Sequence, residues 1–306
     1  MQHRLEYAAF QLFKWAILTL PLKSAQRLGG YVGSLAFYFI PSRRRVALEN
    51  LRFAFPEMTE SARMAIVKGA FRNYGITLVE LLWFPHLTDA ILRKLVTVRN
   101  PEVLAKGYSA GRGMVMLSGH FGNWELIALG VAHLTGIPFS IIVQTQANKF
   151  IDRVINRHRC LFGNSVIPMG MSVRGIIKML SEGGVVAIAP DQSGPMEGVF
   201  VDFFGRSVAT HQGPAAFALR NRAPLQMGFM IRKPDGTYEV ILEEVRTDDL
   251  AEPTEENIIE LTRRHTALLE RYIRLYPDHW LWMHRRWKHT WESVHREQER
   301  VDESRS

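Results

Sequence analysis

The chain has 306 residues, of which 47% are hydrophobic and 22% charged, so it can bury a large core and has the composition of an ordinary folded protein. Its single cysteine, Cys160, excludes an internal disulfide, and no cysteine and histidine cluster has metal-ligand spacing. The net charge of +8 suits an anionic lipid, an acidic protein or a nucleic acid, but the known nucleic-acid-binding modules are absent. We expect no metal, no other cofactor and no nucleic acid partner.

The first 45 residues are predicted to be a helical segment that associates with a membrane, ahead of one catalytic domain over residues 46–306. Apolar residues dominate over 5–22 and 28–40. On a helix, four polar residues share one narrow face, and the rest is apolar apart from Glu6 and Thr19. The four residues on this face are Arg4, Tyr7, Gln11 and Lys14. The run is marginal as a spanning helix, which needs about 20 apolar residues, so an in-plane anchor or a short span fits better. A buried core helix is the alternative.

Three consecutive arginines, at positions 43–45, follow the second apolar run. Such a cluster tends to stay on the cytoplasmic side of a membrane and to meet anionic headgroups. No small-residue cleavage site follows the first run, so we do not expect the segment to be removed as a signal peptide.

The rest of the chain alternates between helical and strand patterns. A helix is predicted over 59–84, where apolar residues recur at helical spacing and Pro85 ends the pattern. Further helices are predicted at 123–133, 150–162, 173–180, 213–221 and, capped by Thr254, up to residue 276. Buried strands are predicted at 114–118, 139–143 and 185–189, and a hairpin at 224–232 and 238–243. This order predicts an α/β fold with a mostly parallel central sheet flanked by helices.

Polar sequence follows two of the predicted strands. Residues 118–125 read Ser-Gly-His-Phe-Gly-Asn-Trp-Glu, and residues 190–194 read Pro-Asp-Gln-Ser-Gly. Because ligands bind beyond the carboxyl ends of parallel strands, both segments should open on the same edge of the sheet. That edge is the predicted active site.

The first of these segments places His120 five residues before Glu125. The spacing alone is weak, since 11 histidines among 30 acidic residues give about one such match by chance. His265 and Glu270 repeat it inside the long C-terminal helix, where positions five apart diverge by roughly 140° and do not meet. His120 lies instead in a turn, so Glu125 is expected to reach back to the imidazole. A structural histidine is the alternative.

This turn would supply a base for a hydroxyl group. Neutral His120 would take the proton of an attacking alcohol, and Glu125 would fix the tautomer and stabilise the imidazolium. Backbone N–H groups near Gly122 and the helix start are the candidate donors to an oxyanion. The sequence shows neither a nucleophilic serine elbow nor a reactive cysteine, so we expect direct attack without an acyl-enzyme.

A series of motifs follows the N-terminal apolar segment in order along the chain. They are Ser118-Gly-His-Phe-Gly-Asn-Trp-Glu125, Asn156-Arg157-His-Arg159, Gly175-Ile-Ile-Lys178, Ala189-Pro-Asp-Gln192, Gly198-Val-Phe-Val-Asp-Phe-Phe-Gly205, Thr210 and Trp282-Met-His-Arg-Arg-Trp-Lys288. With this set, over most of its length, the chain resembles the late acyltransferases of lipid A biosynthesis, the lauroyl/myristoyl transferase family.

The resemblance implies an acyl group delivered by acyl carrier protein to a hydroxyl of an anionic lipid A precursor. It places this reaction at the cytoplasmic face of a bacterial inner membrane, with His120 and Glu125 as the catalytic pair. The substrate-binding positions that it suggests are Gly122, Asn123, Arg157, Arg159, Asp191, Gln192, Thr210 and Arg285. Both the acidic donor protein and the anionic acceptor suit a basic chain.

Some of these positions also suit simpler roles. Arg157 and Arg159 fit a solvated helix face, and Asp191 fits the cap of a turn. Arg285, among tryptophans, fits an interfacial aromatic belt without a substrate contact.

Two positions depart from the family pattern. The chain has Gln-Thr-Gln at 144–146, where members often have Tyr-Arg-Pro, and Asp202 where many have proline. The first change removes a cation near the acceptor region. The same chemistry on a glycerol phosphate, a lysophospholipid or another glycolipid is therefore an alternative. A non-catalytic, basic protein at the membrane surface is a further alternative, which the setting of His120 and Glu125 disfavours.

Overall fold

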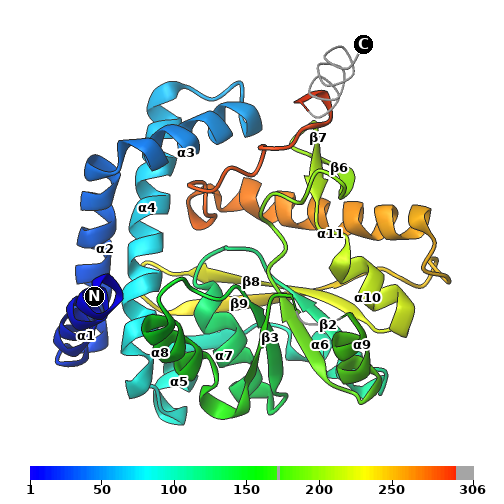
Figure 1. Ribbon diagram of the computed structural model, residues 1–306, viewed down its shortest axis with the longest axis horizontal. Coiled ribbons are helices and arrows are strands. Elements are labelled where there is room, and N and C mark those ends of the chain that lie inside the picture. The colour runs from blue at the N-terminus through cyan, green and yellow to red at the C-terminus, as the bar shows by residue number, and fades with distance from the viewer. Residues whose placement is uncertain (171–172, 294–306) are drawn as a thin grey trace.

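Seven strands form the central sheet of the computed structural model, which describes residues 1–170 and 173–293 (Figure 1). The strand order is β1-β9-β8-β2-β5-β3-β4, and all neighbours are parallel except β8 and β9. Two further strands, β6 and β7, form a separate antiparallel pair. The bounds are β1 Val96–Val98, β2 Met114–Leu117, β3 Phe139–Val143, β4 Ser165–Pro168, β5 Val185–Ile188, β6 Val199–Phe203, β7 Arg206–Thr210, β8 Leu225–Arg232 and β9 Tyr238–Val245.

Helices cover both faces of this sheet. One hydrophobic core joins a sheet face to α5 (Asp89–Leu95), α6 (Pro101–Ser109) and α7 (Trp124–Thr135). The other core joins the opposite face to α9 (Val173–Ser181), α10 (Gly213–Asn221) and α11 (Glu255–Leu275). The remaining elements of the domain are α8 (Lys149–Arg159) and the short 3-10 turns η1 (Phe84–His86), η2 (Leu161–Gly163) and η3 (Pro277–His279). The predicted α/β class with a mostly parallel sheet is confirmed.

The predicted elements appear with bounds that shift by a few residues. The hairpin is the antiparallel pair of β8 and β9, and Thr254 caps α11 by accepting from the Asn257 N–H at 3.3 Å. His265 and Glu270 do not pair, as predicted: His265 is buried, and Glu270 binds the Phe204 N–H and Arg274. The sequence did not predict α3, α5, α6 or the strands β1, β4, β6 and β7, and each of those four strands has only three to five residues.

The N-terminal helices lie along one side of the domain (Figure 1). They are α1 (Gln2–Leu18), α2 (Leu22–Phe39), α3 (Pro41–Ala54) and α4 (Glu60–Trp83). Glycines let α2 and α4 approach closely, because a Cβ added at Gly33 would lie 2.2 Å from the Phe71 carbonyl oxygen and one at Gly75 would lie 2.3 Å from that of Gly29. Backbone contact of this kind fixes how α2 lies against the domain.

The first helix turns three residues of its polar stripe toward the protein, leaves Arg4 exposed and points much of its apolar side outward. Tyr7 and Gln11 are half-buried, whereas Leu5, Leu12 and Trp15 are 64%, 69% and 67% exposed. The alternative of a buried core helix therefore does not hold for α1. Among the described residues, no helix has the length and apolar content that crossing a bilayer requires.

Candidate active site

Two polar segments meet where adjacent parallel strands end. Leu117 at the end of β2 pairs with Ile188 at the end of β5, so the residues that follow both strands emerge at the same sheet edge. One segment brings His120 and the other brings Asp191. The prediction that both segments open on the same edge of the sheet is confirmed.

His120 and Asp191 form a tight pair at this edge. The imidazole Nδ1 lies 2.7 Å from Asp191 Oδ1, and the backbone N–H of His120 donates to Oδ2 at 2.8 Å. The indole N–H of Trp280 also donates to Oδ2, at 2.8 Å. The Asp191 side chain is only 4% exposed and the His120 side chain 21%. With Nδ1 occupied by the carboxylate, Nε2 is the ring nitrogen left for a substrate, and Gln192 Nε2 lies 3.5 Å from it.

The surroundings shift both titrations in the direction that a charged pair requires. Burial disfavours the imidazolium, but the charge and hydrogen bond of Asp191 outweigh burial and raise the pKa of His120 above its usual 6.5. Burial likewise opposes ionisation of Asp191, but His120, its backbone N–H and Trp280 lower the pKa of the carboxyl to about 2. Asp191 is therefore a carboxylate at neutral pH, and His120 is a stronger base than a free histidine.

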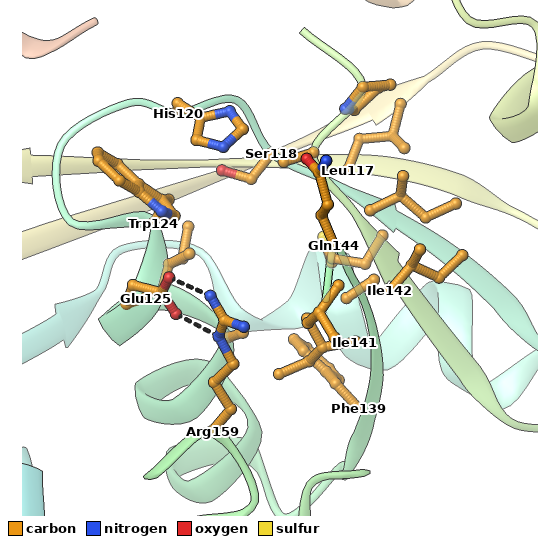
Figure 2. Close-up of a pocket in the computed structure, with 18 of the residues that line it drawn as sticks. Leu117, Ser118, His120, Trp124, Glu125, Phe139, Ile141, Ile142, Gln144 and Arg159 are labelled. Carbon is orange, nitrogen blue, oxygen red and sulfur yellow. Dashed lines mark hydrogen bonds and ion pairs between the residues drawn. The ribbon is translucent and has the colours of Figure 1, made fainter. Parts of the chain in front are cut away.

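The expected contact between Glu125 and the imidazole is wrong. Glu125 instead forms a two-pronged ion pair with Arg159, whose Nε and Nη2 donate at 2.8 and 2.6 Å (Figure 2). Both side chains are nearly buried, at 10% and 14% exposure. Glu125 lies in the first turn of α7, where a side chain points along the helix, and Arg159 at the end of α8 faces it. Asp191, which follows the neighbouring strand β5, binds the imidazole instead of Glu125.

Beside this pair lies a cavity of about 560 Å³, within the usual range of roughly 300–1,000 Å³ for ligand pockets. His120 and the Glu125–Arg159 pair line one side of it (Figure 2). Aliphatic and aromatic side chains form most of the rest, together with the polar residues Ser118, Gln144, Gln146, Gln192 and His211. The apolar side chains between α7 and the sheet include Met116, Ile127, Val131, Phe139, Ile141 and Ala187. A mostly apolar cavity beside a half-buried base suits a long hydrocarbon whose reactive end remains at the sheet edge.

Gly122 and Asn123, which were predicted to contact substrate, do not line the cavity. The Gly122 N–H donates to the His279 carbonyl at 2.8 Å, so it is not a donor to an oxyanion. Its φ is +59°, and an added Cβ would lie 1.8 Å from the Met230 carbonyl oxygen, which explains the glycine. Asn123 is fully buried and its Oδ1 caps α7 by accepting from the Leu126 N–H at 2.9 Å.

The other predicted positions divide between the cavity and its surroundings. Arg159 and Gln192 line the cavity, and Asp191 holds the catalytic candidate His120. Arg157 is exposed on α8 and Arg285 is exposed beyond η3, and neither lines the cavity.

Thr210 does not reach the cavity either. It is buried and accepts from Arg286 Nη2 at 2.6 Å, while Arg286 Nη1 donates to the Ala209 carbonyl at 2.7 Å. Burial lowers the pKa of Arg286 to about 10. This arginine ties β7 to the C-terminal segment, so Thr210 serves the fold.

Both departures from the family pattern have a place in the structure. Gln144 lines the cavity where β3 ends and is exposed. Asp202 closes the turn between β6 and β7 by accepting from the Gly205 N–H at 3.1 Å.

Among the residues after α11, sequence reasoning assigned only Arg285 to the site and missed Trp280 and Leu281. Trp280 binds Asp191, and the Leu281 N–H donates to the His120 carbonyl at 3.0 Å. The segment lies beside the 118–125 turn through an isolated bridge between Phe121 and Trp280. The dense tryptophans here were the only signal in the sequence, and they also suit an aromatic belt.

Comparison with known proteins gives a consistent family. A family model described as bacterial lipid A biosynthesis acyltransferase matches residues 3–289. The lipid A biosynthesis lauroyltransferase of Escherichia coli K12 is 29% identical over 281 residues, 90% of this chain and 88% of that protein. The palmitoleoyltransferase of the same strain is 28% identical over 282 residues, with 90% and 88% covered. A phosphatidylinositol mannoside acyltransferase of Mycolicibacterium smegmatis is 24% identical over 164 residues, 52% of this chain and 54% of that protein.

Proposed function

This chain belongs to the bacterial lipid A biosynthesis acyltransferase family, and on that premise we propose that it moves a fatty acyl chain from acyl carrier protein to a hydroxyl group of a lipid A precursor. The observation that carries the proposal is the pair of half-buried His120 and buried Asp191 beside a mostly apolar cavity. A base and a hydrocarbon pocket in one place are what acyl transfer to an alcohol needs.

His120 acts as a general base in this proposal. Its Nε2 takes the proton of the acceptor hydroxyl as the oxygen attacks the thioester carbonyl carbon. Asp191 keeps the other nitrogen protonated and stabilises the imidazolium. The tetrahedral intermediate collapses with cleavage of the C–S bond, and the imidazolium returns its proton to the leaving thiolate. The Gln192 amide, 3.5 Å from Nε2, replaces Gly122 as candidate donor to the oxyanion.

In this proposal, Glu125 assists His120 through its charge and through its ion pair with Arg159. The carboxylate adds to the stabilisation of a charged His120, and the ion pair fixes the guanidinium on the cavity wall. A planar guanidinium in that position suits an anionic oxygen of either substrate. Glu125 and Arg159 are thus proposed to orient substrates next to the base.

Acyl carrier protein is acidic, and the helix beside the cavity presents cations to it. Lys149, Arg153 and Arg157 are exposed and follow one another at intervals of four residues along α8. Within residues 1–170 and 173–293, none of the three forms an ion pair. Arg159 of the same helix lines the cavity, so a donor bound to this stripe would lie near the place where its acyl arm enters.

The N-terminal helices are proposed to bind the cytoplasmic face of the inner membrane as an in-plane anchor. The outward side chains of α1 and α2 include Leu12, Trp15, Tyr31 and Phe39, which are 67–78% exposed. The arginines at 43–45 lie in the first turn of α3, next to these helices. Apolar side chains beside cations suit an anionic bilayer surface.

A second acceptor class is favoured by one observation, that one relative is named for a phosphatidylinositol mannoside. It also fits the expected departure from the family pattern at 144–146, of which Gln144 lines the cavity. The same base and cavity would then serve another anionic glycolipid. A purely binding protein is disfavoured, because it has no need of a half-buried histidine paired with a buried carboxylate beside an acyl-sized cavity.

Product mass in a membrane assay tests the proposal. The protein is incubated with acyl carrier protein thioesters of several chain lengths and vesicles that contain a lipid A precursor, a lysophospholipid or a mannosylated phosphatidylinositol. We expect one acyl chain to be added to the lipid A precursor. Product on another lipid alone would establish the second acceptor class, and no product on any of them would refute acyl transfer.

A further inference from the structure

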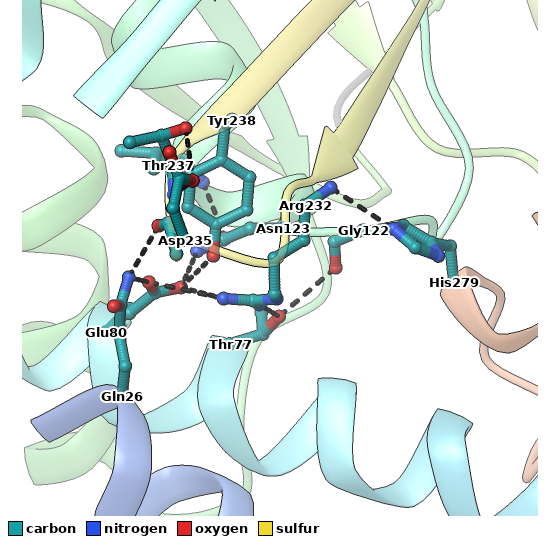
Figure 3. A network of polar contacts seen from close by, with 12 residues as sticks. Gln26, Thr77, Glu80, Gly122, Asn123, Arg232, Asp235, Thr237, Tyr238 and His279 are labelled. Atoms are coloured by element: carbon teal, nitrogen blue, oxygen red, sulfur yellow. Dashed lines mark hydrogen bonds and ion pairs between the residues drawn. The ribbon is translucent and has the colours of Figure 1, made fainter. Parts of the chain in front are cut away.

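A buried carboxylate on α4 gathers side chains from four separate elements. Glu80 is 2% exposed, and its oxygens accept from Gln26 of α2 and Asn123 of the 118–125 turn, each at 2.7 Å. Arg232 at the end of β8 donates at 3.2 Å, and the Tyr238 hydroxyl at the start of β9 donates as well. Figure 3 shows these groups converging on the carboxylate.

Donor groups surround this side chain. Amide and guanidinium N–H groups only donate, so the Glu80 oxygens accept from Gln26, Asn123 and Arg232 together. A buried ion pair adds little net stability, because an apolar cluster of equal volume serves as well or better. What it does supply is a fixed direction for each partner, and this points to positioning.

The element that these contacts position is the 118–125 turn, which carries His120. Thr77 lies one helical turn before Glu80 on the same face of α4, and its hydroxyl donates to the Gly122 carbonyl at 3.1 Å. Two consecutive residues of the turn, Gly122 and Asn123, are therefore held by one helix face. Arg232 links the two contacts, because it donates to Glu80 and its Nη2 also lies 3.3 Å from Thr77 Oγ1.

The opposite side of the turn is held independently. His120 is fixed by Asp191 and by the Leu281 N–H, and Gly122 by the His279 carbonyl. The side toward α4 has only the Thr77 and Glu80 contacts among the hydrogen bonds of described residues. Movement of the turn away from α4 would draw the imidazole from Asp191 and from the cavity.

We infer that Glu80 is a positioning residue, which sets the place of His120 by holding the Asn123 amide in the turn between β2 and α7. The inference rests on the proposed function for its kinetic consequence and on the structure alone for its geometric consequence. Glu80 touches no substrate, since it does not line the cavity.

An exchange of partners tests this relationship. In Asn123→Asp, the new side chain still caps α7, because aspartate caps as well as asparagine, but two carboxylates now face each other. The double variant Glu80→Gln with Asn123→Asp restores an amide and carboxylate pair with the roles reversed, and keeps one negative charge near Arg232. The matched control is Tyr238→Phe, which removes a different donor to the same Glu80 oxygen as Asn123.

We expect Asn123→Asp to lower kcat by roughly 10- to 100-fold with a much smaller change in KM, since a displacement of about 1 Å has such an effect. The double variant should recover most of the loss. Tyr238→Phe should keep kcat within about twofold, although its Tm falls by a few degrees. Unchanged kcat in Asn123→Asp, no recovery in the double variant, or an equal loss in Tyr238→Phe would each overturn the inference.

A second measurement does not depend on acyl transfer. The His120 Nδ1 proton, bonded to Asp191, gives a low-field proton NMR signal that His120→Gln identifies by its loss. This signal should shift or disappear in Asn123→Asp and return in the double variant, while an unchanged signal in Asn123→Asp would refute the positioning role. If the wild-type protein transfers no acyl group, the proposed function fails, and this signal still decides the role of Glu80.

Discussion

Nδ1 of His120 lies 2.7 Å from Oδ1 of Asp191, although 71 residues separate them in the chain. The two meet because β2 and β5 are parallel neighbours in register, so the residues that follow each strand emerge side by side. The imidazole is thus oriented from the adjacent strand, and the carboxylate five residues after it serves Arg159. This arrangement separates the task of holding the base from that of arranging the substrate.

Replacing the carboxylate beside the base should change both rate and pH dependence. A general base works as the neutral imidazole, so kcat/KM should rise with pH through the raised pKa of His120, above 6.5. In Asp191→Asn, the carboxylate that offsets burial is lost and the pKa of the imidazole falls, so the acid limb should move to lower pH. The plateau should fall by about 10²- to 10⁴-fold. If the acid limb of kcat/KM in Asp191→Asn stays at the wild-type pH, Asp191 does not raise the pKa of the catalytic base.

The Glu125–Arg159 pair should behave as a unit. Removing either partner leaves a nearly buried charge unpaired, so Glu125→Gln and Arg159→Gln should each lower the free energy of unfolding by about 3–5 kcal/mol. The double variant should lose less than the sum, with a coupling of about 1–3 kcal/mol in urea unfolding. Glu125→Gln should also move the acid limb of kcat/KM less than Asp191→Asn does. A larger shift would mean that Glu125 holds the imidazole during turnover.

The length of the accepted acyl chain should follow the depth of the cavity. Phe139 and Ile141 lie at the end of the cavity far from His120 (Figure 2). Phe139 begins β3 and Val143 ends it, so about 13 Å of strand separates Phe139 from the sheet edge. Ile141→Phe should therefore reduce the ratio of the rates with long and short acyl donors by about tenfold or more. One methylene group more or less in an apolar pocket changes the free energy of transition-state binding by about 1–3 kcal/mol. Competition between two donors, read by product mass, measures this ratio. An unchanged ratio would place the acyl chain elsewhere.

Acidic substitutions on α1 should weaken membrane binding. Leu12 and Trp15 are 69% and 67% exposed, and a carboxylate there opposes insertion into an anionic interface. Sedimentation with vesicles that contain anionic lipid should show less binding for Leu12→Glu and Trp15→Glu. The control Ile259→Glu, at an exposed position of α11, should bind as the wild type does. Equal binding by all three variants would exclude α1 as the anchor.

Buried His158 should make stability fall on acidification. Burial lowers its pKa from 6.5 to about 4, only partly offset by the hydrogen bond of its Nδ1 to the Leu81 carbonyl. Between these values the unfolded chain takes up a proton that the folded protein does not, so the free energy of unfolding decreases as the pH falls from 6.5 toward 4. His158→Asn cannot titrate and should flatten this dependence in urea unfolding at pH 7 and 4.5. An identical slope would mean that His158 is protonated in the fold.

Patterns local in sequence predicted the frame of the molecule well. Apolar runs bounded by glycine and proline located the central strands, and the polar residues after β2 and β5 located the active-site edge. Edge strands such as β4 were not predicted, because four residues show too little periodicity. The order of strands in the sheet also depends on contacts between distant segments that single-sequence patterns do not record.

The partners within the site were predicted less well. The spacing of His120 and Glu125 suggested a contact because both lie in one short segment, but α7 directs the glutamate toward α8 instead. Asp191 was predicted to bind substrate or to cap a turn, and its contact with His120 was missed. Glu80 was not named at all, because a lone glutamate in an apolar helix carries no pattern. Gly122 was expected to leave its amide open to an oxyanion, and only the position of His279 shows otherwise.

Acyl transfer by His120→Ala tests the central claim most directly. The variant and the wild type are compared on vesicles with the same acyl carrier protein thioester and lipid A precursor, with folding and vesicle binding verified for both. We expect the variant to bind the vesicles normally and to form acylated product at least about 10²-fold more slowly, since the base proposed to take the hydroxyl proton is removed. Product formation at the wild-type rate would contradict the account.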